Sequence, residues 1–251
     1  MANVVDHQCT LYRSRNPTRR WLHQTRRRCI KKALRSYAPN GPEPTLGLEI
    51  GPGSGTYLET LLEVCDRVIA ADIEPSFLAQ AQVVAAGNPR LSTAVDNLAA
   101  SQLPTASFDL ILCTEVIEHL PESAAAFKNL CRLLKPNGTL ILSTPQRWSV
   151  MEVCARIALL PGFIHLARAV YGESVEPTGH INLLTPGQLR RQIHDAGLRQ
   201  MSCWCTGLYL PGVAEVGGFA GRRLLGFLER SLGQTALRWA LWTQYYVIKR
   251  K

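Results

Sequence analysis

The sequence lacks several features that would place it in a specialised class of protein. No apolar run is long enough to cross a bilayer, and the first residues hold no apolar core of a signal peptide. The eight cysteines show no C-x-x-C spacing, and Cys203 and Cys205, on one side of an expected strand, make a poor metal pair. We therefore expect small buried thiols in a reducing compartment. The protein is expected in the cytoplasm, soluble or peripheral to a membrane.

Acidic residues are missing from one part of the chain. The stretch between His7 and Pro42 holds ten of the 28 Lys and Arg residues and no Asp or Glu. The other 18 basic residues nearly cancel the 19 acidic ones, so the formal charge of +9 belongs to this arm. Asn16 followed by Pro17 predicts a helix start, and the helix can run to about Tyr37.

This helix shows a narrow apolar stripe, formed by Leu22, Cys29, Ile30, Ala33, Leu34 and Tyr37. Basic residues are expected on its other sides: Arg19, Arg20, Arg26, Arg27, Arg28, Lys31, Lys32 and Arg35. Three interpretations fit: a solvated helix at the domain edge, a helix lying with residues 17–37 on an anionic lipid surface, and an arm that grips nucleic-acid phosphates. The lipid surface is favoured over nucleic acid, because no other basic face carries aromatics for base stacking.

The remaining sequence is organised around a glycine-rich turn. An apolar run over residues 46–50 leads into Gly51, Gly53 and Gly55 and then into helical sequence. Glycine is needed where the backbone takes positive φ or approaches a ligand closely. The third glycine comes one position too early for the dinucleotide fingerprint G-x-G-x-x-G. A second strand over residues 67–72 ends in Asp72, at the distance that brings a carboxylate beside a ribose.

The pattern Glu49-x-Gly51-x-Gly53-x-Gly55 resembles motif I of the class I S-adenosylmethionine (SAM)-dependent methyltransferases. Residues 72–75 and 134–145 resemble two further segments of that family. The resemblance implies an α/β fold, a doubly wound, Rossmann-like sheet of seven strands whose last two strands are antiparallel, with SAM over the carboxyl ends of strands one, two and four. The cofactor-binding residues that it implies are Glu49, Gly51, Gly53, Gly55, Asp72, Ile73, Asp96, Asn97 and Thr114.

Within this set, the resemblance assigns the adenine amino group to Asp96 and the adenine ring to the next backbone N–H, that of Asn97. Asp96 could instead cap the helical turn that follows it, and the two roles are compatible. The sequence is divided into a basic helical arm, 1–44, and a methyltransferase domain, 45–251. Residues 147–178 are expected to form an inserted lid of two short helices, with core helix as the alternative. Residues 207–251 are expected to form part of the wall of the acceptor site, the edge of the sheet or a surface that faces a membrane.

Candidate catalytic residues follow the fourth expected strand. Glu115, Glu118 and His119 stand at i, i+3 and i+4, so a helical turn would place them on one face, and His180 follows the lid. The arrangement resembles the O-methyltransferases of ubiquinone biosynthesis and the enzymes that methylate the 2′-hydroxyl of small RNAs. It implies a divalent cation such as Mg²⁺ on Glu115, Glu118, His119 and His180, with Glu115 and the two histidines in catalysis. The alternatives are a histidine base without metal, Glu118 as a helix-start acid, and a structural His180.

These features predict methyl transfer from SAM to a hydroxyl oxygen of a small aromatic or lipid-like acceptor. The cofactor motifs are shared by O-, N- and C-methyltransferases, so they do not choose the acceptor atom. A first alternative is an RNA 2′-O-methyltransferase, with the basic arm on the phosphates. A second is a SAM-binding protein without turnover that serves as a partner or assembly factor. No pattern in the sequence indicates an oligomeric state.

Overall fold

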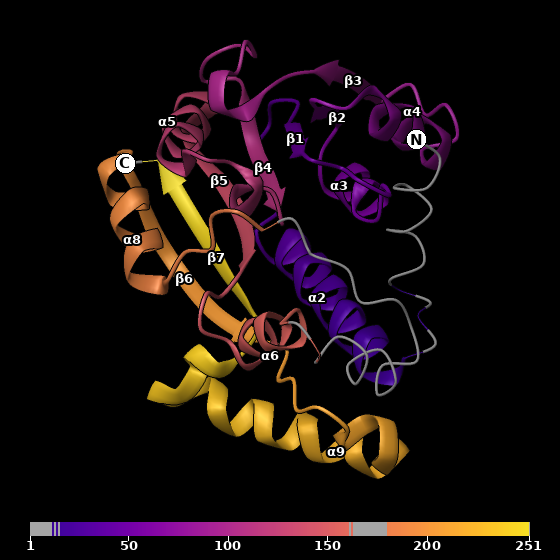
Figure 1. Ribbon diagram of the computed structural model, residues 1–251. Helices are drawn as coiled ribbons and strands as arrows, with labels where there is room; N and C mark the ends of the chain where they lie inside the picture. Colours follow the sequence, from indigo (N-terminus) through magenta and orange to yellow (C-terminus); the bar gives the residue numbers. More distant parts are fainter. Residues whose placement is uncertain (1–11, 13, 15, 161, 163–179, 251) are drawn as a thin grey trace.

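The computed structural model describes residues 12, 14, 16–160, 162 and 180–250 (Figure 1). Its centre is a seven-stranded sheet in the order β3-β2-β1-β4-β5-β7-β6, in which β7 alone runs in the direction opposite to the other six strands. The strands are β1 (Leu46–Ile50), β2 (Arg67–Asp72), β3 (Leu91–Val95), β4 (Phe108–Thr114), β5 (Leu134–Pro145), β6 (Leu198–Thr206) and β7 (Thr243–Arg250). The doubly wound sheet and its antiparallel last pair are confirmed.

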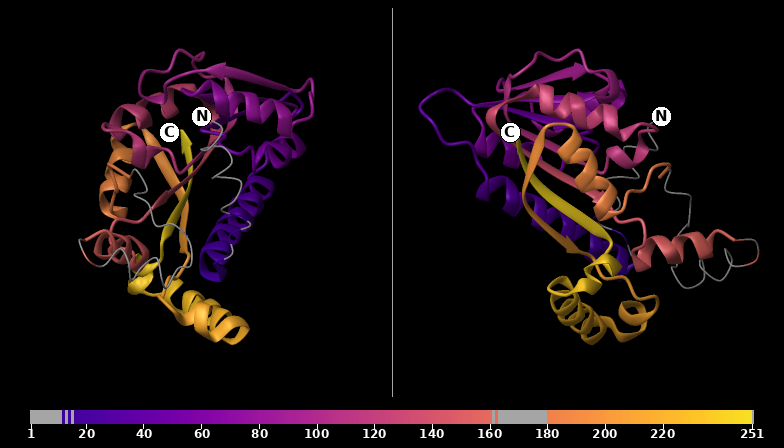
Figure 2. Two further views of the ribbon diagram at one scale, coloured as in Figure 1. Left: turned by 45° about the vertical axis from the view of Figure 1, so that its right-hand side comes forward. Right: turned by 90° about the vertical axis from the view of Figure 1, so that its left-hand side faces the viewer.

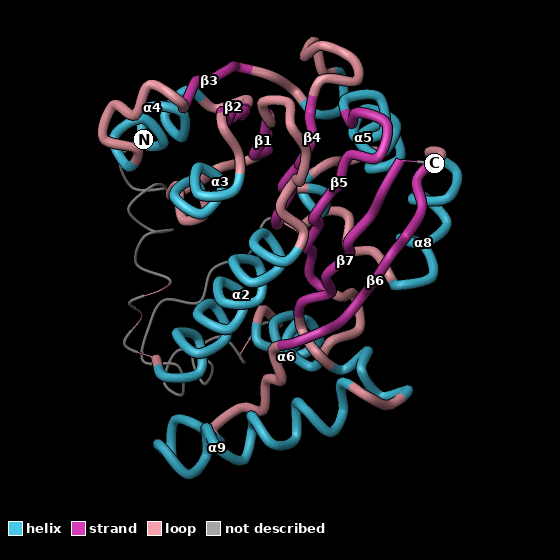
Figure 3. The backbone as a smooth tube through the Cα atoms, turned by 180° about the vertical axis from the view of Figure 1, so that it is seen from behind, coloured by secondary structure: helices cyan, strands magenta, loops and turns pink. Residues whose placement is uncertain are grey.

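Helices cover both faces of this sheet (Figures 2 and 3). Alternate residues of β4 enter opposite cores, as the two-residue period of a strand requires: Leu110 and Leu112 in one, Ile111 and Cys113 in the other. One core is closed by α2 (Pro17–Ser36), α3 (Leu58–Val64) and α4 (Pro75–Val84). The other is closed by α5 (Ser123–Leu133) and α8 (Pro186–Asp195).

The helix of the basic arm, α2, is part of the first core. Its start is as expected: Pro17 is the first helical residue, and the Asn16 side chain accepts a hydrogen bond of 2.9 Å from the Arg19 N–H. Ile30 and Leu34 are fully buried and pack with residues of α3 and the sheet. Burial of this kind is the main source of helix stability in a folded protein. The arm therefore contributes to the core of the domain that it precedes.

One residue of the arm is placed differently from the prediction. Arg26, expected on the solvated side of the helix, is 8% exposed. The reason is the helical period: Leu22, Arg26, Ile30 and Leu34 follow one another at intervals of four, so all four project from one face. The buried stripe of α2 contains a charge, and that charge lies close to the end of the sheet where the candidate site is found.

Several elements begin earlier than expected. The turn-forming residues 135–138 predict a strand that begins only at Thr139, but β5 begins at Leu134 and includes the turn, with Asn137 at φ 66°. The sequence predicts a further strand from Met201 to Thr206, but β6 begins at Leu198. An amphipathic segment over 224–232 predicts a helix, which is found as the longer α9 (Val213–Gly233), followed by the 3₁₀ helix η3 (Ala236–Ala240).

The expected lid is described over residues 147–160 and at 162 only. Helix α6 (Val150–Ala158) is the first of the two short helices predicted there, and the second lies outside the described residues. Among the described residues, no helix is both long and apolar enough to span a membrane.

The burial of α2 can be tested by truncating its most buried leucine. Leu34→Ala removes apolar contacts and leaves a cavity, and we expect it to lower the free energy of unfolding by about 2 to 5 kcal/mol. Lys32→Ala on the exposed side is the matched control, with a change below about 0.5 kcal/mol. Urea unfolding followed by circular dichroism gives both values. Equal stability of the two variants would mean that α2 is not part of the core.

Candidate active site

The glycine-rich turn forms a cradle at the carboxyl end of β1. Gly51, Gly53 and Gly55 all have positive φ, between 51° and 74°. A Cβ on Gly51 would lie 2.6 Å from a methyl group of Val116, and one on Gly55 would lie 3.1 Å from the Val84 side chain. Glycine is therefore required by conformation and by space at this turn, which lies at the carboxyl end of a central strand.

An acidic residue lies directly below this turn. Glu49, on β1, is 1% exposed, and neither carboxylate oxygen has a hydrogen-bond partner among the described residues. Burial raises the pKa of Glu49 well above its usual value. A buried carboxyl group without partners is costly, so its position fits a ligand that brings a donor or a positive charge to the cradle.

Two further carboxylates line the same edge of the sheet. The Asp96 N–H donates to the Asp72 carbonyl oxygen over 3.0 Å, which brings the ends of β2 and β3 together. Asp72 Oδ1 accepts from the Glu74 N–H at 2.9 Å, and burial raises the pKa of Asp72. Ile73, beside it, is 66% exposed and offers an apolar surface to a flat ring.

The alternative role considered for Asp96, a helix cap, is wrong. Asn97 caps the 3₁₀ helix η1 (Leu98–Ala100) by accepting from the Ala99 N–H at 3.0 Å. Asp96 Oδ1 accepts from the Gln102 N–H at 2.8 Å, while Oδ2 is buried without a hydrogen-bond partner among the described residues. This second oxygen is available to an amino group. Thr114, at the end of β4, is 8% exposed.

Three of the four predicted acceptor-site residues lie together. Possible ligand atoms of Glu118, His119 and His180 are all within 4.8 Å of one another, and the two imidazole rings are 5.4 Å apart. Glu118 is fully buried, and its Oε2 accepts from the Thr144 hydroxyl at 3.0 Å. Its Oε1 has no partner among the described residues. Burial, and secondarily the neighbouring Glu115, raises the pKa of Glu118 well above its usual value.

Glu115 is turned away from that group. Its backbone has a φ of 54°, and the following 3₁₀ helix η2 (Ile117–His119) is a single turn, so Glu115 does not share a helical face with Glu118 and His119. Its carboxylate pairs with Arg26 and accepts from the Ser143 hydroxyl at 2.8 Å. The expectation of one helical face for all three residues is therefore wrong, because the chain reverses sharply at the end of β4.

Arg26 connects helix α2 to the candidate site through its ion pair with Glu115. Burial is the largest influence and lowers the pKa of Arg26, but Glu115 and the neighbouring tyrosines together outweigh it and raise this pKa above its usual value. The guanidinium also donates to His23 Nδ1 at 2.9 Å and lies 5.1 Å from the ring centre of Trp242. A buried cation is tolerated when it is paired and hydrogen-bonded in this way. Arg26 thereby joins α2 to Glu115, directly after β4, and to Trp242, directly before β7.

His180 is fixed by the backbone beside it. The N–H groups of Ile181 and Asn182 both donate to the Glu118 carbonyl oxygen, at 3.0 and 2.9 Å. The Asn182 amide donates to the Leu120 carbonyl oxygen and the Ser123 hydroxyl, each at 3.0 Å. His180 therefore stays beside Glu118 through main-chain contacts, whatever the state of its own ring.

Glu152, on α6, is a site residue that the sequence analysis missed. It is 4% exposed, its Oε1 lies 3.3 Å from His180 Nδ1 without hydrogen-bond geometry, and it accepts from Trp242 Nε1 at 3.1 Å. One signal could have revealed it: Glu152 is the only acidic residue between positions 147 and 160, a largely apolar stretch with sparse charge. A carboxylate behind a histidine can orient the ring and stabilise its protonated form.

The fold and the site define a class I SAM-dependent methyltransferase. A family described as "Methyltransferase domain" matches residues 21–202, and the chain belongs to this methyltransferase family. The match begins within α2, which agrees with the packing of that helix in the core.

Curated relatives add a narrower likeness over part of the chain. A ubiquinone biosynthesis O-methyltransferase of Xanthomonas oryzae is 35% identical over 105 residues, which are 40% of this chain and 43% of the relative. The chain thus matches less than half the length of this relative. The likeness supports a SAM-dependent methyltransferase and does not by itself assign an acceptor.

Solved structures show the same fold at low identity. The N-methyltransferase NodS of Bradyrhizobium japonicum, in complex with S-adenosyl-L-homocysteine, is 18% identical with a TM-score of 0.54, covering 94% of this chain and 89% of its own. The cyclase SpnF is 14% identical with a TM-score of 0.60, covering 90% and 81%. Identities this low show the fold alone, and proteins of different activity share it.

The residues present fit the cofactor of the class. The methionine part of SAM carries an ammonium group, which the unpaired carboxyl of Glu49 can receive. The half-buried Asp72 and the unpaired oxygen of Asp96 offer acceptors for ribose hydroxyls and an adenine amino group. A side chain at Gly51 would collide with Val116, so the turn keeps its backbone uncovered by a side chain at this position.

The role assigned to Asp72 can be tested by calorimetry. Asp72→Ala removes the acceptor expected to hold both ribose hydroxyls, and we expect SAM affinity to fall at least about tenfold. Glu74→Ala, at the exposed start of α4, is the neighbouring control. Unchanged SAM affinity in Asp72→Ala would remove the ribose assignment.

The buried Glu49 predicts a dependence of stability on pH. Because its folded pKa is raised, its contribution to stability is fully present below the ordinary value of 4.5 and is lost as the pH rises toward the folded pKa. Glu49→Gln cannot ionise. Without SAM, this variant should gain stability relative to the wild type from about pH 5 to pH 8, and it should bind SAM more weakly. A stability difference that is flat across this range would contradict the assignment.

Proposed function

We propose that the protein transfers the methyl group of SAM to a hydroxyl oxygen of a small aromatic or lipid-like acceptor. The observation that carries this proposal is the pair of imidazoles, His119 and His180, 5.4 Å apart, in which His119 follows three residues after Val116, the side chain that lies over Gly51. A hydroxyl acceptor must lose a proton, and two neighbouring histidines are suited to receive it. The likeness to ubiquinone biosynthesis O-methyltransferases points to the same type of acceptor.

SAM, when bound, supplies a methyl group on a sulfonium, which is already a strong electrophile. The task of the protein is then to orient the acceptor in line and to remove its proton. A phenol, with a pKa of about 10, is mostly protonated at neutral pH, so a base is needed. In our proposal His180 or His119 takes the hydroxyl proton, and Glu152 stabilises the protonated ring of His180.

A divalent cation such as Mg²⁺ is a second element of the proposal. Glu118 offers an oxygen without a hydrogen-bond partner among the described residues, and the two histidines offer ring nitrogens within 4.8 Å. Carboxylate and imidazole are suitable ligands for several divalent ions. Glu118 would bind as the carboxylate, so a cation would offset the burial that raises its pKa. Glu115, the fourth residue implied by the family resemblance, is paired with Arg26 instead.

The proposed activity is tested by calorimetric SAM binding, followed by methyl transfer to catechols, phenols and short RNAs. Each assay is run with Mg²⁺ and with EDTA. Methylation of a catechol that is lost in EDTA would support both the phenolic acceptor and the cation. Turnover that is indifferent to EDTA would leave the histidines as metal-free bases. SAM binding without turnover on any acceptor would favour a SAM-binding partner or assembly protein.

Substitutions at the histidines test the assignment of the base. His180→Ala or His119→Ala should lower kcat by about 10²-fold or more while SAM still binds. Glu152→Gln retains an acceptor for Trp242 Nε1 and removes only the charge, so we expect a smaller loss of kcat, about tenfold. His194→Ala, on the exposed end of α8, is the control. Full turnover in both His119→Ala and His180→Ala would return these residues to a structural role.

RNA 2′-O-methylation is kept as a second candidate because of one surface of α2. Residues of its exposed side line an open hollow of about 580 Å³: Gln24, Arg27, Arg28, Lys31, Lys32, Arg35 and Ser36. Two of these, Lys31 and Arg35, pair with Glu59 and Glu63 of α3. RNA held through this surface would lose affinity steeply with added salt, whereas binding of a lipid-like acceptor should withstand salt.

A further inference from the structure

Helix α9 has two apolar faces, of which only one is used in the core. Leu225 is fully buried and packs with Leu208 and Leu241, and Leu228 and Leu232 flank this cluster. On the other side, Phe219 is 68% exposed and Phe227 is 60% exposed. A helix in a water-exposed position normally carries an apolar stripe on the core side only. The outer stripe of α9 is therefore unexplained by folding.

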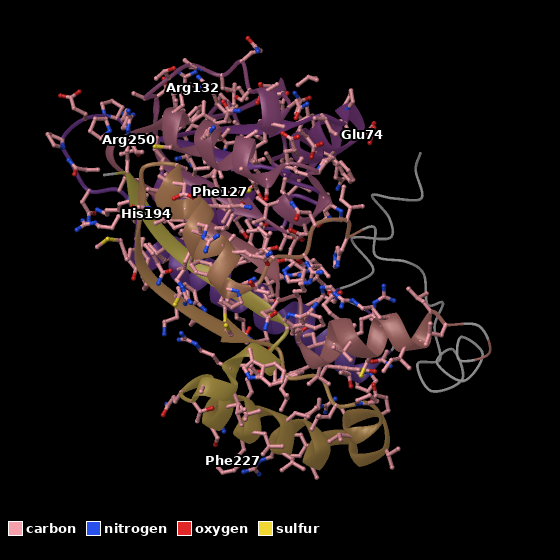
Figure 4. All side chains as sticks on the ribbon, turned by 60° about the vertical axis from the view of Figure 1, so that its left-hand side comes forward. Glu74, Phe127, Arg132, His194, Phe227 and Arg250 are labelled. Carbon is pink, nitrogen blue, oxygen red and sulfur yellow. The ribbon has the colours of Figure 1, made fainter. Side chains whose placement is uncertain are left out.

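The outer stripe combines aromatic rings with arginines. Phe219, Arg223, Phe227 and Arg230 follow at intervals of four, four and three, so they share one face. The Arg223 guanidinium lies 5.8 Å from the ring centre of Phe219. Phe227 lies at the far end of the molecule, on α9 and away from the sheet (Figure 4). We call these four residues the α9 outer face.

The local backbone supports this placement. Gly218 has φ 53° and ψ −123°, so α9 bends just before Phe219. At Gly221 a Cβ would lie 2.1 Å from the Val213 carbonyl oxygen, so the turn before the bend is folded tightly onto the rest of the helix. Val216, within that first turn, is 91% exposed. The first turn of α9 thus presents a further apolar side chain to solvent.

Two other elements, η3 and α6, also carry exposed apolar side chains. Leu237 and Trp239 of η3 are 51% and 46% exposed, and Ile157 of α6 is 47% exposed. Between these elements lies an apolar hollow of about 460 Å³, lined by Gln146, Trp148, Val153, Pro186 and Trp239. Half-exposed tryptophans are typical of the boundary between apolar and aqueous phases.

At this end of the molecule the acidic side chains face the protein, and the positive charges remain at the surface. The stretches 147–160 and 207–242 contain six arginines and three acidic residues. Glu152 is buried against His180 and Trp242, Glu215 accepts from the Asn16 side chain at 3.3 Å, and Glu229 accepts from the Gly207 and Leu208 N–H groups at 3.0 and 3.2 Å. All three acids thus turn toward the protein. Positive charge remains around the exposed apolar side chains.

We propose that the α9 outer face docks the protein on an anionic phospholipid surface. Phe219 and Phe227 enter the boundary between headgroups and acyl chains, and Arg223 and Arg230 pair with lipid phosphates. Exposed apolar area and positive charge on one face are the combination that such a surface attracts. The basic face of α2, favoured for this role from the sequence, lacks exposed aromatic residues and pairs two of its cations with α3.

Vesicle flotation tests the proposal without any assay of turnover. The wild type should float with vesicles of equimolar phosphatidylcholine and phosphatidylglycerol, and less with phosphatidylcholine alone. Phe219→Ser/Phe227→Ser should weaken binding to the anionic vesicles about tenfold or more. Arg223→Gln/Arg230→Gln should remove the preference for the anionic lipid. Val83→Ser, which removes an exposed side chain of α4, is the matched control and should bind as the wild type.

Other results would overturn the proposal. One is wild-type protein that does not float, and another is wild-type affinity in Phe219→Ser/Phe227→Ser. A third is loss of binding in Arg27→Gln/Lys32→Gln of α2 with no effect of the α9 variants. Light scattering adds a fourth: a wild-type dimer that the α9 variant dissociates, with no vesicle binding, would make this face a contact between two copies. Circular dichroism of each variant confirms that it is folded.

Discussion

The buried ion pair between Arg26 and Glu115 is the contact on which the arrangement of the site depends. It joins the first helix to the carboxyl end of β4, and Trp242 lies against the same guanidinium. Removing either partner would leave the other charge buried and unpaired, which costs far more than an exposed pair contributes. The pair also holds the Glu115 carboxylate toward α2, and Glu118, His119 and His180 form the acceptor-side group without it.

Much of the cofactor side could be predicted from the sequence because its determinants are local. Gly51, Gly53 and Gly55 indicate a turn with positive φ. The number of residues between Gly51 and Asp72 is typical of one strand-helix-strand unit. The same reasoning placed the strands within a few residues, with the largest error at β5. That strand begins at Leu134, before a turn whose residues favoured a loop. Local patterns of this kind do not depend on where distant segments pack.

The acceptor side could be predicted only in part, because its contacts join distant segments. Glu118, His119 and His180 were chosen correctly as neighbours, from family resemblance as much as from spacing. Arg26 was assigned to solvent, although its interval of four from Leu22 and Ile30 already indicated the buried face. Glu152 lies on a helix of the inserted segment, and no spacing relates it to His180 or Trp242. Glu115 has a left-handed backbone, which is uncommon for a residue other than glycine and cannot be predicted from its residue type.

His180 is anchored by the two residues that follow it in the chain. Because Ile181 and Asn182 hold the Glu118 carbonyl oxygen, the position of the imidazole is set from its downstream side. The same carbonyl belongs to the residue that stands beside His119, so Glu118, His119 and His180 are tied to one short segment at the end of β4. A shift of that segment would move all three side chains together and preserve their mutual geometry.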